Sequence, residues 1–433
     1  MTNNLNPGQK KAVATLLTFL TTSSQNERYI LLEGYAGTGK THCLKELLRL
    51  YKGRAVLTAP TNKATKVLQS TLTSAEYKPD CCTIFSLLGL QLTDDKELRE
   101  VIQSNADLDL SRFSLIIVDE ASMVNSELLE HIKTAAKKTK AKFLFIGDSY
   151  QLPPVKEYGS AVWTMFKDTP ALEILQLTEV MRHGGYIQTC LEQIRAAIPK
   201  PFGFILDFLN NTSKDNEEVS VLSSINGYAL IAKIAAESPD EFLKLNRTKV
   251  IAWRNNTVDT LNALIRKIIF PLVTERWAIG DRIVIRSQAK DFIESKVFAT
   301  VDEEGAVVKV TTGKHPIYDL KVYNVTALME DNKTKIFVVL HEDSLTDYRI
   351  MKADKLQEAK LDRKKWTNFW KFVEYFHDLG YAYAITAHRA QGSSYKQVIV
   401  MFGDIMVNRS RQDALKCLYV AASRAQKKLI FVK

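Results

Sequence analysis

The sequence predicts an α/β protein with two parallel sheets and a small antiparallel barrel inserted within the second half of the chain. Short, continuous apolar runs such as residues 115–118 are typical of buried parallel strands. Such runs alternate with helical patterns within residues 29–177, and they do so again within 249–269 and 382–432. Between about 279 and 342 the hydrophobic period becomes two, and Gly and Asp turns separate the runs, which favours antiparallel strands.

The composition is that of an ordinary globular protein, and the charge suggests a polyanionic partner. With 433 residues, 46% of them hydrophobic, the chain is long enough for roughly two to four domains. The net charge of +10 indicates nucleic acid before membrane, with a mildly basic enzyme lacking such a partner as the alternative. No apolar run approaches the roughly 20 residues of a membrane span, and residues 1–10 are too polar for a signal peptide. The cysteines contain no C-x-x-C pair, so we expect no disulfide framework, no zinc site and a reducing compartment.

Residues 34–41, GYAGTGKT, fit the phosphate-binding pattern G-x-x-x-x-G-K-[ST]. An apolar strand pattern precedes them and a helical pattern follows, which is the context that the motif requires. Backbone N–H groups at Gly37, Thr38 and Gly39 would converge on the phosphates. Lys40 would reach the β- and γ-phosphates, and the Thr41 hydroxyl would hold Mg²⁺. The sequence therefore predicts binding of a nucleoside triphosphate with Mg²⁺.

The strand pattern at 115–118 delivers two carboxylates, Asp119 and Glu120, to its C-terminal end. In a parallel sheet this end is where ligands bind. Asp119 can hold the water shell of Mg²⁺, and Glu120 can orient and deprotonate an attacking water. These residues are therefore candidates for the hydrolytic part of the site.

Three more polar side chains are candidates because of their positions in the chain. Gln151 follows a buried strand pattern and could sense the γ-phosphate and relay its presence to a bound strand. Arg182 could reach the transferred phosphate, with a surface salt bridge as the alternative. Gln9 stands in the first turn of a helix that begins at Asn6-Pro7, and its amide suits the two edges of adenine.

Two segments suggest contacts with a nucleic acid. Pro60, Thr61 and Asn62 follow the second strand pattern, where free N–H groups could bind a backbone phosphate. The alternative is that Thr61 is a plain helix N-cap. Residues 348–377 combine Lys and Arg with aromatic residues, which could contact a nucleic-acid backbone and stack on bases. A helix that covers the barrel with its aromatic face is the alternative there, and we favour it.

Taken together and in order, these segments resemble superfamily 1 DNA helicases of the 5′→3′ branch that includes RecD and the bacteriophage helicase Dda. The resemblance covers nearly the whole chain and rests on GYAGTGKT, APTNKA, CTIFSLLGL, VDEASM, GDSYQLPPV, LTEVMR, AWRNNTVDTLN, TAHRAQGSS and LYVAASRAQ. It implies ATP as the nucleotide, with Gln9 as the adenine-reading glutamine. It also implies Arg182 and Arg424 as two arginine fingers, a type of residue worth about 10³–10⁵ in turnover.

The resemblance further implies two RecA-like P-loop NTPase domains, a small inserted pin subdomain and an inserted SH3-like β-barrel domain. The first RecA-like domain would span residues 1–190, with the pin subdomain at 91–111. The second would combine 191–287 with 379–433, and residues 288–378 would form the barrel and a helical segment. No Phe, Tyr or Trp lies within 91–111, although the pin of Dda-like relatives carries an aromatic residue that stacks on a base pair.

By the same resemblance, single-stranded DNA would contact residues from several motifs: Pro60, Thr61, Asn62, Thr83, Phe85, Trp253, Asn255, His388 and Gln391. Gly392 would belong to the nucleotide site. Phe85 stands where the family often has a His, and an aromatic ring there can still stack on a base.

The function expected on this basis is ATP-dependent 5′→3′ translocation on single-stranded DNA with unwinding of the duplex. The alternatives are an ATP-driven translocase or protein-displacing factor with little unwinding, and an RNA-directed member of the fold. Expected partners are single-stranded DNA and its junctions with duplex, and single-strand-binding or replication proteins. We expect a monomer without a membrane partner in a bacterial or bacteriophage-infected host cytosol.

Overall fold

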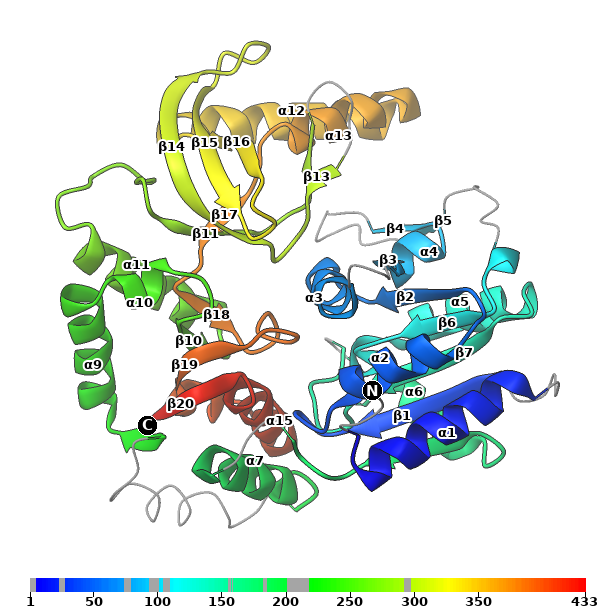
Figure 1. Cartoon of the computed structure of the whole chain (residues 1–433). Helices are drawn as coiled ribbons and strands as arrows, with labels where there is room; N and C mark the ends of the chain where they lie inside the picture. The colour runs from blue at the N-terminus through cyan, green and yellow to red at the C-terminus, as the bar shows by residue number, and fades with distance from the viewer. Residues whose placement is uncertain are drawn as a thin grey trace. The chain divides into compact units, whose positions relative to one another are not determined.

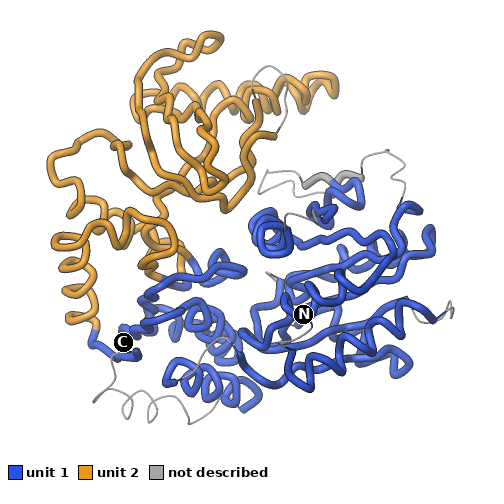
Figure 2. Tube along the Cα trace, viewed as in Figure 1, with its two compact units in different colours: residues 1–223, 251–253, 386–433 blue, residues 224–250, 254–385 orange. Residues whose placement is uncertain are grey.

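A computed structural model gives the architecture of most of the chain (Figure 1). It describes residues 5–22, 28–73, 79–92, 101–103, 110–154, 157, 159–181, 185–200, 218–291 and 297–433. By compactness the chain divides into two units, which Figure 2 shows in blue and orange. Unit 1 comprises Met1–Ser223, Ile251–Trp253 and Thr386–Lys433, and unit 2 comprises Ser224–Val250 and Arg254–Ile385. The domain boundaries inferred from the motifs stay a prediction.

A six-stranded, all-parallel sheet forms the centre of unit 1, with the strand order β3-β2-β6-β7-β1-β8. Its strands are β1 (Tyr29–Gly34), β2 (Ala55–Ala59), β3 (Asp80–Thr83), β6 (Leu115–Val118), β7 (Lys142–Gly147) and β8 (Glu173–Leu177). Because β6 is LIIV and is buried on both faces, its side chains alternate between two hydrophobic clusters. The predicted parallel α/β architecture is confirmed.

Helices cover both faces of this sheet. On one face lie α1 (Pro7–Thr21), α2 (Lys40–Leu50) and α3 (Asn62–Leu72). On the other face lie α5 (Ser126–Lys137), α6 (Ala161–Asp168) and the single turn α4 (Ile84–Leu87). At the predicted insertion, β4 (Leu90–Leu92), which begins one residue before it, and β5 (Val101–Gln103) pair antiparallel, as a hairpin does. A role of this hairpin as a strand-separating pin stays a prediction.

A second, five-stranded sheet has the order β18-β10-β19-β20-β9. Its strands are β9 (Val219–Leu222), β10 (Thr248–Ala252), β18 (Ala384–Thr386), β19 (Tyr395–Val400) and β20 (Ala425–Val432). In unit 1, α7 (Gly185–Ala197) packs on α15 (Arg411–Ala422), which follows the short α14 (Phe402–Ile405). Almost every residue in the second half of α15 is buried, because this helix lies between the sheet and other helices.

Unit 2 contains helices α9 (Ser224–Glu237), α10 (Asp240–Leu243) and α11 (Asn255–Ile269), and an antiparallel sheet of order β16-β15-β14-β11-β17. The strands of this sheet are β11 (Arg282–Ile285), β14 (Glu304–Lys314), β15 (Lys321–Met329), β16 (Thr334–Leu340) and β17 (Leu379–Tyr381). A smaller ladder joins β12 (Ala289–Lys290) to β13 (Val297–Ala299). The antiparallel pairing agrees with the predicted change of period. Its classification as an SH3-like barrel stays a prediction.

Helices α12 (Leu345–Leu361) and α13 (Trp366–Glu374) lie between β16 and β17 in the chain. The α13 residue Phe372 packs with Phe376 against Val322 and Leu340 of the sheet. The aromatic face of this helix therefore covers the sheet, as the favoured interpretation of residues 348–377 predicts. Among the described residues, no helix combines the length and the apolar character needed to cross a membrane.

Candidate active site and strand-binding elements

The phosphate loop connects the C-terminal end of β1 with the N-terminus of α2. Gly39 has a φ of +82°, in the left-handed region that favours glycine, and a Cβ there would come within 2.4 Å of the Gln9 amide nitrogen. At Gly34 a Cβ would come within 2.5 Å of the Thr38 hydroxyl oxygen. Both positions therefore need glycine in this loop conformation, which presents Lys40 and Thr41 in the first turn of α2.

Gln9 is buried against the phosphate loop, 2% exposed, and its side-chain nitrogen donates a 2.9 Å hydrogen bond to the Thr38 carbonyl. The other end of the same amide accepts from the Asn6 backbone N–H at 3.0 Å. Asn6 in turn accepts from the Gln9 backbone N–H at 2.7 Å, which completes a capping box at the start of α1. The N-terminus of α1 thus orients the amide that the resemblance assigns to adenine.

The Lys40 ammonium lies against the loop itself. Its Nζ donates to the Gly34 carbonyl at 2.5 Å and to the Tyr35 carbonyl at 3.1 Å. A phosphate group offers a charged acceptor in place of these two neutral ones, and charge-assisted hydrogen bonds are roughly twice as strong as neutral ones. The position of Lys40 is therefore compatible with the role predicted for it.

Asp119 and Glu120 follow β6, as the sequence predicts. The Asp119 backbone N–H donates to the Thr58 carbonyl at 2.8 Å, which holds it at the end of the strand ladder with β2. Glu120 has a φ of +50°, a left-handed conformation that is uncommon for a residue with a Cβ. Burial, and next the adjacent Glu120 carboxylate, raise the pKa of Asp119, while Lys40 opposes the rise. A cation beside these carboxylates would relieve both effects.

This donor set fits Mg²⁺ better than a metal that needs a complete protein cage. Across the described ranges, no cluster of three or more His, Cys, Asp or Glu side chains is arranged to hold a metal. Mg²⁺ keeps several water ligands and binds through one or two protein groups together with substrate phosphates. The Thr41 hydroxyl and the Asp119 carboxylate are the residues that would hold it.

Gln151 follows β7 and is buried, 5% exposed. Within the described part of the chain, its side-chain oxygen is a buried acceptor without a hydrogen-bond partner. Leaving such a group unpaired costs about 1–3 kcal/mol, so a donor on a ligand or a water would satisfy it. This is the state expected of a residue whose partner arrives with the ligand.

Of the two predicted arginine fingers, Arg424 is described and Arg182 lies outside the described residues. Arg424 is 6% exposed and its guanidinium bonds to its own end of α15, through the Val420 carbonyl and the Ser423 hydroxyl. It also donates to the Ser393 carbonyl at 3.2 Å. To reach a phosphate, this side chain has to exchange these partners.

The residues near the N-terminal sheet that are predicted to contact single-stranded DNA have roles in the local structure. Thr61 caps α3 by accepting from the Ala64 backbone N–H at 3.2 Å, and Thr83 caps α4 in the same way at 3.1 Å. The cap that the sequence left open as the alternative for Thr61 is therefore present. Phe85 is half-buried against the hydrophobic cluster beneath α4, and Pro60 and Asn62 are half-buried beside Thr61.

The structure describes every predicted site residue of the motifs between residues 253 and 392. Gln391 is buried and its side-chain nitrogen donates to the Leu152 carbonyl at 3.5 Å, one residue after Gln151. Gly392 lies against Ala64 of α3, to which a Cβ would make an ordinary contact at 3.9 Å.

Burial lowers the pKa of His388, and Asp413 opposes this. Elsewhere, the Trp253 backbone N–H donates to Asp404 at 2.7 Å, and Asn255 is the exposed first residue of α11.

Sequence reasoning assigned no role to two residues that the structure places at the loop, Asp148 and Tyr419. The Tyr419 hydroxyl donates to the Asp148 carboxylate at 2.9 Å and accepts from the Ala36 backbone N–H at 3.1 Å. Burial raises the pKa of Asp148, while Lys40 opposes the rise most strongly. Both residues stand inside quoted motifs, GDSYQLPPV and LYVAASRAQ, but neither motif reveals that they touch.

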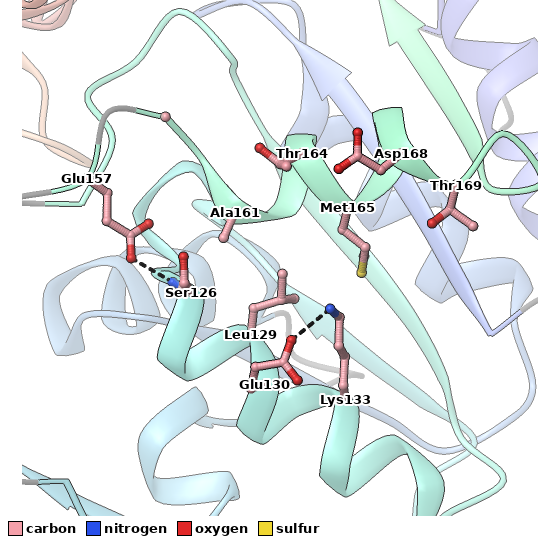
Figure 3. A pocket seen from close by; sticks show the side chains of 11 residues that line it. Ser126, Leu129, Glu130, Lys133, Glu157, Ala161, Thr164, Met165, Asp168 and Thr169 are labelled. Atoms are coloured by element: carbon pink, nitrogen blue, oxygen red, sulfur yellow. Dashed lines mark hydrogen bonds and ion pairs between the residues drawn. The ribbon is translucent and has the colours of Figure 1, made fainter.

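A groove of about 630 Å³ lies between α5 and α6, with Leu129, Ala161 and Met165 among its lining residues (Figure 3). Glu130 and Lys133, which also line it, form an ion pair at 2.8 Å. None of the predicted nucleotide or DNA residues lines this groove. It is therefore separate from the candidate active site.

The glycine loop on a parallel sheet, with a lysine in the helix turn and carboxylates at a neighbouring strand end, defines a P-loop nucleoside triphosphatase. Residues 4–200 match the AAA domain family, and residues 381–432 match the UvrD-like helicase C-terminal domain. By these matches the chain is similar to the Dda, RecD and Pif1 helicases of superfamily 1B.

Several relatives span the whole chain. The ATP-dependent DNA helicase dda of Enterobacteria phage T4 is 22% identical over 99% of both chains, and an uncharacterized protein of Acanthamoeba polyphaga mimivirus is 23% identical over 99% of both. The RecD subunit of the RecBCD enzyme from Buchnera aphidicola is 34% identical over 36% of this chain and 27% of that protein. The structure of Bacteroides Pif1 helicase in complex with ADP-AlF3 and ssDNA has a TM-score of 0.57 at 16% identity, covering 99% of this chain and 92% of that one. That likeness shows the fold.

Proposed function

We propose that this protein is an ATP-dependent DNA helicase that translocates 5′→3′ on single-stranded DNA and unwinds duplex. The observation that carries the proposal is that the nucleotide loop and the C-terminal motifs contact each other within unit 1. Tyr419 reaches the loop backbone at Ala36, and Gln391 reaches the segment that contains Gln151. A nucleotide-dependent change at the loop can therefore act on segments proposed to hold DNA. The direction of movement rests on the resemblance to the RecD and Dda branch.

In the proposed site, the loop N–H groups and Lys40 bind the phosphates, and the Gln9 amide binds adenine. Bound Mg²⁺, held by Thr41 and Asp119, would neutralise phosphate charge. Glu120 orients the attacking water and accepts its proton. Arg424 and Arg182 stabilise the charge that develops on the transferred phosphate.

Gln151 is proposed to detect the γ-phosphate through its side-chain nitrogen, because a phosphate oxygen can only accept hydrogen bonds. Its buried side-chain oxygen, which has no partner within the described residues, would accept from a water at the site. The next residue, Leu152, accepts the hydrogen bond from Gln391. A rotation or shift of residues 151–152 on nucleotide binding would therefore change the hydrogen bond of Gln391, which is proposed to contact the DNA strand.

Contacts to DNA are proposed at the turns that follow strands of both parallel sheets. They comprise Pro60, Thr61, Asn62, Thr83, Phe85, Trp253, Asn255, His388 and Gln391, with Gly392 supporting the nucleotide side. The hydroxyls of Thr61 and Thr83 already accept from the Ala64 and Ser86 N–H groups, so a hydroxyl contact with a phosphate at either residue would have to replace its cap bond. Binding of this kind is salt-sensitive and weakly sequence-specific.

A second candidate function is an ATP-driven single-stranded DNA translocase or protein-displacing factor that unwinds little. It is favoured by one observation, the lack of any Phe, Tyr or Trp within residues 91–111, where the β4–β5 hairpin lies. Proposed partners for either function are single-strand/duplex junctions and single-strand-binding or replication proteins. We propose a monomer acting in the cytosol.

The test of the proposed function is hydrolysis of ATP with and without single-stranded DNA, comparing the unaltered protein with Lys40→Ala. We expect DNA to stimulate hydrolysis by the unaltered protein. Removing the charged donor should lower kcat by roughly 10²–10³-fold or more while leaving DNA binding intact. Strong DNA-stimulated hydrolysis by Lys40→Ala would contradict the assignment of the phosphate loop.

A further inference from the structure

Tyr419 lies on α15 and is 1% exposed, yet its hydroxyl joins three separate parts of unit 1. It accepts a 3.1 Å hydrogen bond from the backbone N–H of Ala36, inside the phosphate loop. It donates a 2.9 Å hydrogen bond to Oδ2 of Asp148, directly after β7. One oxygen atom therefore connects α15 to the loop and to the strand end that leads to Gln151.

The chemistry of a hydroxyl gives each of these bonds a fixed direction. An ionised carboxylate can only accept hydrogen bonds, so the single proton of Tyr419 goes to Asp148. The loop N–H is then matched by a lone pair of the same oxygen. Burial, and next the Asp148 carboxylate, raise the pKa of Tyr419, which keeps its proton in place. Phenylalanine would fill the same volume and make neither bond.

Asp148 is held from its other side by the turn that leads to Gln151. Its second carboxylate oxygen accepts from the Tyr150 backbone N–H at 3.0 Å, and its carbonyl accepts from the Gln151 backbone N–H at 3.1 Å. The positive charge of Lys40 in the phosphate loop opposes the rise in the pKa of Asp148. Burial lowers the pKa of Lys416, one turn before Tyr419 on α15, and the charge of Asp148 opposes this. A triphosphate on the loop would change this balance of charge around Asp148.

Two hydrogen bonds at the C-terminal end of α15 connect Tyr419 to Arg424 through Ser423. The Ser423 backbone N–H donates to the Tyr419 carbonyl at 2.9 Å, which closes the last turn of the helix. The Ser423 hydroxyl then accepts a 2.7 Å hydrogen bond from the Arg424 guanidinium. Arg424 is thus attached to the turn that Tyr419 ties to the phosphate loop.

We propose that Tyr419 is a positioning residue for Arg424: its bonds to Ala36 and Asp148 set the position of α15 against the phosphate loop. Occupation of the loop is thereby transmitted to the arginine. Tyr419 touches neither the proposed substrate nor the reacting atoms. This inference rests on the proposed function, because it assumes that the chain hydrolyses ATP and that Arg424 acts in that reaction.

The test compares the full chain with Tyr419→Phe in DNA-stimulated hydrolysis of ATP. Losing one hydrogen bond to a charged group predicts a fall in kcat of roughly ten- to a hundred-fold. The KM for ATP and the affinity for a fluorescent ADP analogue should stay within about threefold, since the groups proposed to bind the nucleotide are unchanged. A kcat within about twofold of the unaltered protein would overturn the inference.

The matched control is Tyr383→Phe in unit 2. Tyr383 is also fully buried and also donates to a buried carboxylate, at 2.7 Å to Asp281. This variant should lose a comparable amount of stability and keep its kcat. If Tyr383→Phe lowers kcat as much as Tyr419→Phe, the effect is one of general stability and the inference is wrong.

A double-variant comparison separates positioning of Arg424 from any independent role. If Tyr419 acts through Arg424, adding Tyr419→Phe to Arg424→Ala should lower kcat no further. Independent, multiplying losses would contradict the inference.

Asp148→Asn provides a second variant should Tyr419→Phe not fold, because it keeps the side-chain shape and removes the charge that accepts the hydrogen bond from the Tyr419 hydroxyl. We expect it to lower kcat by a smaller factor, and an unchanged kcat would count against the inference. If the unaltered protein shows no DNA-stimulated hydrolysis, the proposed function fails instead.

Discussion

The side-chain nitrogen of Gln9 lies 2.9 Å from the carbonyl oxygen of Thr38, so the first helix is bonded directly to the phosphate loop. Gln9 is also the third residue of α1 and closes the capping box with Asn6. One side chain therefore supports both the start of a helix and the proposed adenine site. These two contributions can be separated by experiment.

Gln9→Ala should raise the KM for ATP roughly tenfold through the loss of one or two hydrogen bonds, and should lower the melting temperature. Asn6→Ala removes the cap, at a cost of about 1 kcal/mol, but leaves the amide of Gln9 in the chain. It should lower the melting temperature without changing KM. Steady-state kinetics and thermal unfolding of both variants check this. Equal effects of the two variants on KM would mean that Gln9 acts only as part of the cap.

Glu120 combines a proposed catalytic role with a left-handed backbone. Glu120→Gln should lower kcat by roughly 10²–10⁴-fold, since the proton acceptor is lost, and should leave binding of ATP intact. Glu120→Gly should be as inactive and at least as stable as Glu120→Gln. The left-handed conformation costs a residue with a Cβ about 1–2 kcal/mol, against about 0.4–1 kcal/mol for the added freedom of glycine in the unfolded chain. A glycine variant that unfolds much more easily would disprove the proposed strain.

The stability of the nucleotide-free protein should depend on pH through Asp119. Its pKa is raised in the folded state, so the free energy of unfolding falls as the pH rises from the ordinary pKa of an aspartate to that raised value, and stays at the lower level above it. Below the ordinary pKa of an aspartate the group is protonated in both states and has no effect. Asp119→Asn should therefore raise the melting temperature at about pH 8, with a smaller gain at about pH 5. A larger gain at the lower pH would reverse the sign and contradict the burial argument.

A buried cluster of charges in unit 2 predicts where the fold is most sensitive. Glu304 accepts from Lys249 at 3.0 Å and from Arg282 at 3.2 Å, and all three side chains are 5% exposed or less. Glu304→Ala leaves two buried cations without this acceptor and should destabilise the protein by about 3–5 kcal/mol. Lys314→Ala, which breaks the exposed Lys314–Asp319 pair, should change stability little. Chemical denaturation followed by circular dichroism measures both, and similar losses would be inconsistent with the burial of the cluster.

The sequence was most informative where local chemistry and local structure coincide. The loop at residues 34–41 and the carboxylates Asp119 and Glu120 could be placed because each follows a strand whose apolar run is continuous. The aromatic face of α13 could be assigned to the sheet because its spacing is helical. The two parallel sheets followed from the same patterns.

Contacts between distant segments could not be predicted in this way. Tyr419 and Asp148 are separated by 271 positions, and nothing in the periodicity around either residue indicates the other. Thr61 shows a second limit, because a threonine before a helix suits a phosphate contact and an N-cap equally well. The left-handed backbone conformation of Glu120 could also not be predicted from the sequence, since strain of this kind arises from the surrounding fold.

The central claim is that ATP hydrolysis at the loop drives movement along DNA, and unwinding of short duplexes with a 5′ or a 3′ single-stranded tail tests it most directly. Lys40→Ala serves as the inactive control. We predict ATP-dependent unwinding from the 5′ tail alone, by the unaltered protein alone. Hydrolysis stimulated by DNA without unwinding from either tail would favour the translocase or displacement factor. Unwinding only from the 3′ tail would contradict the proposed direction.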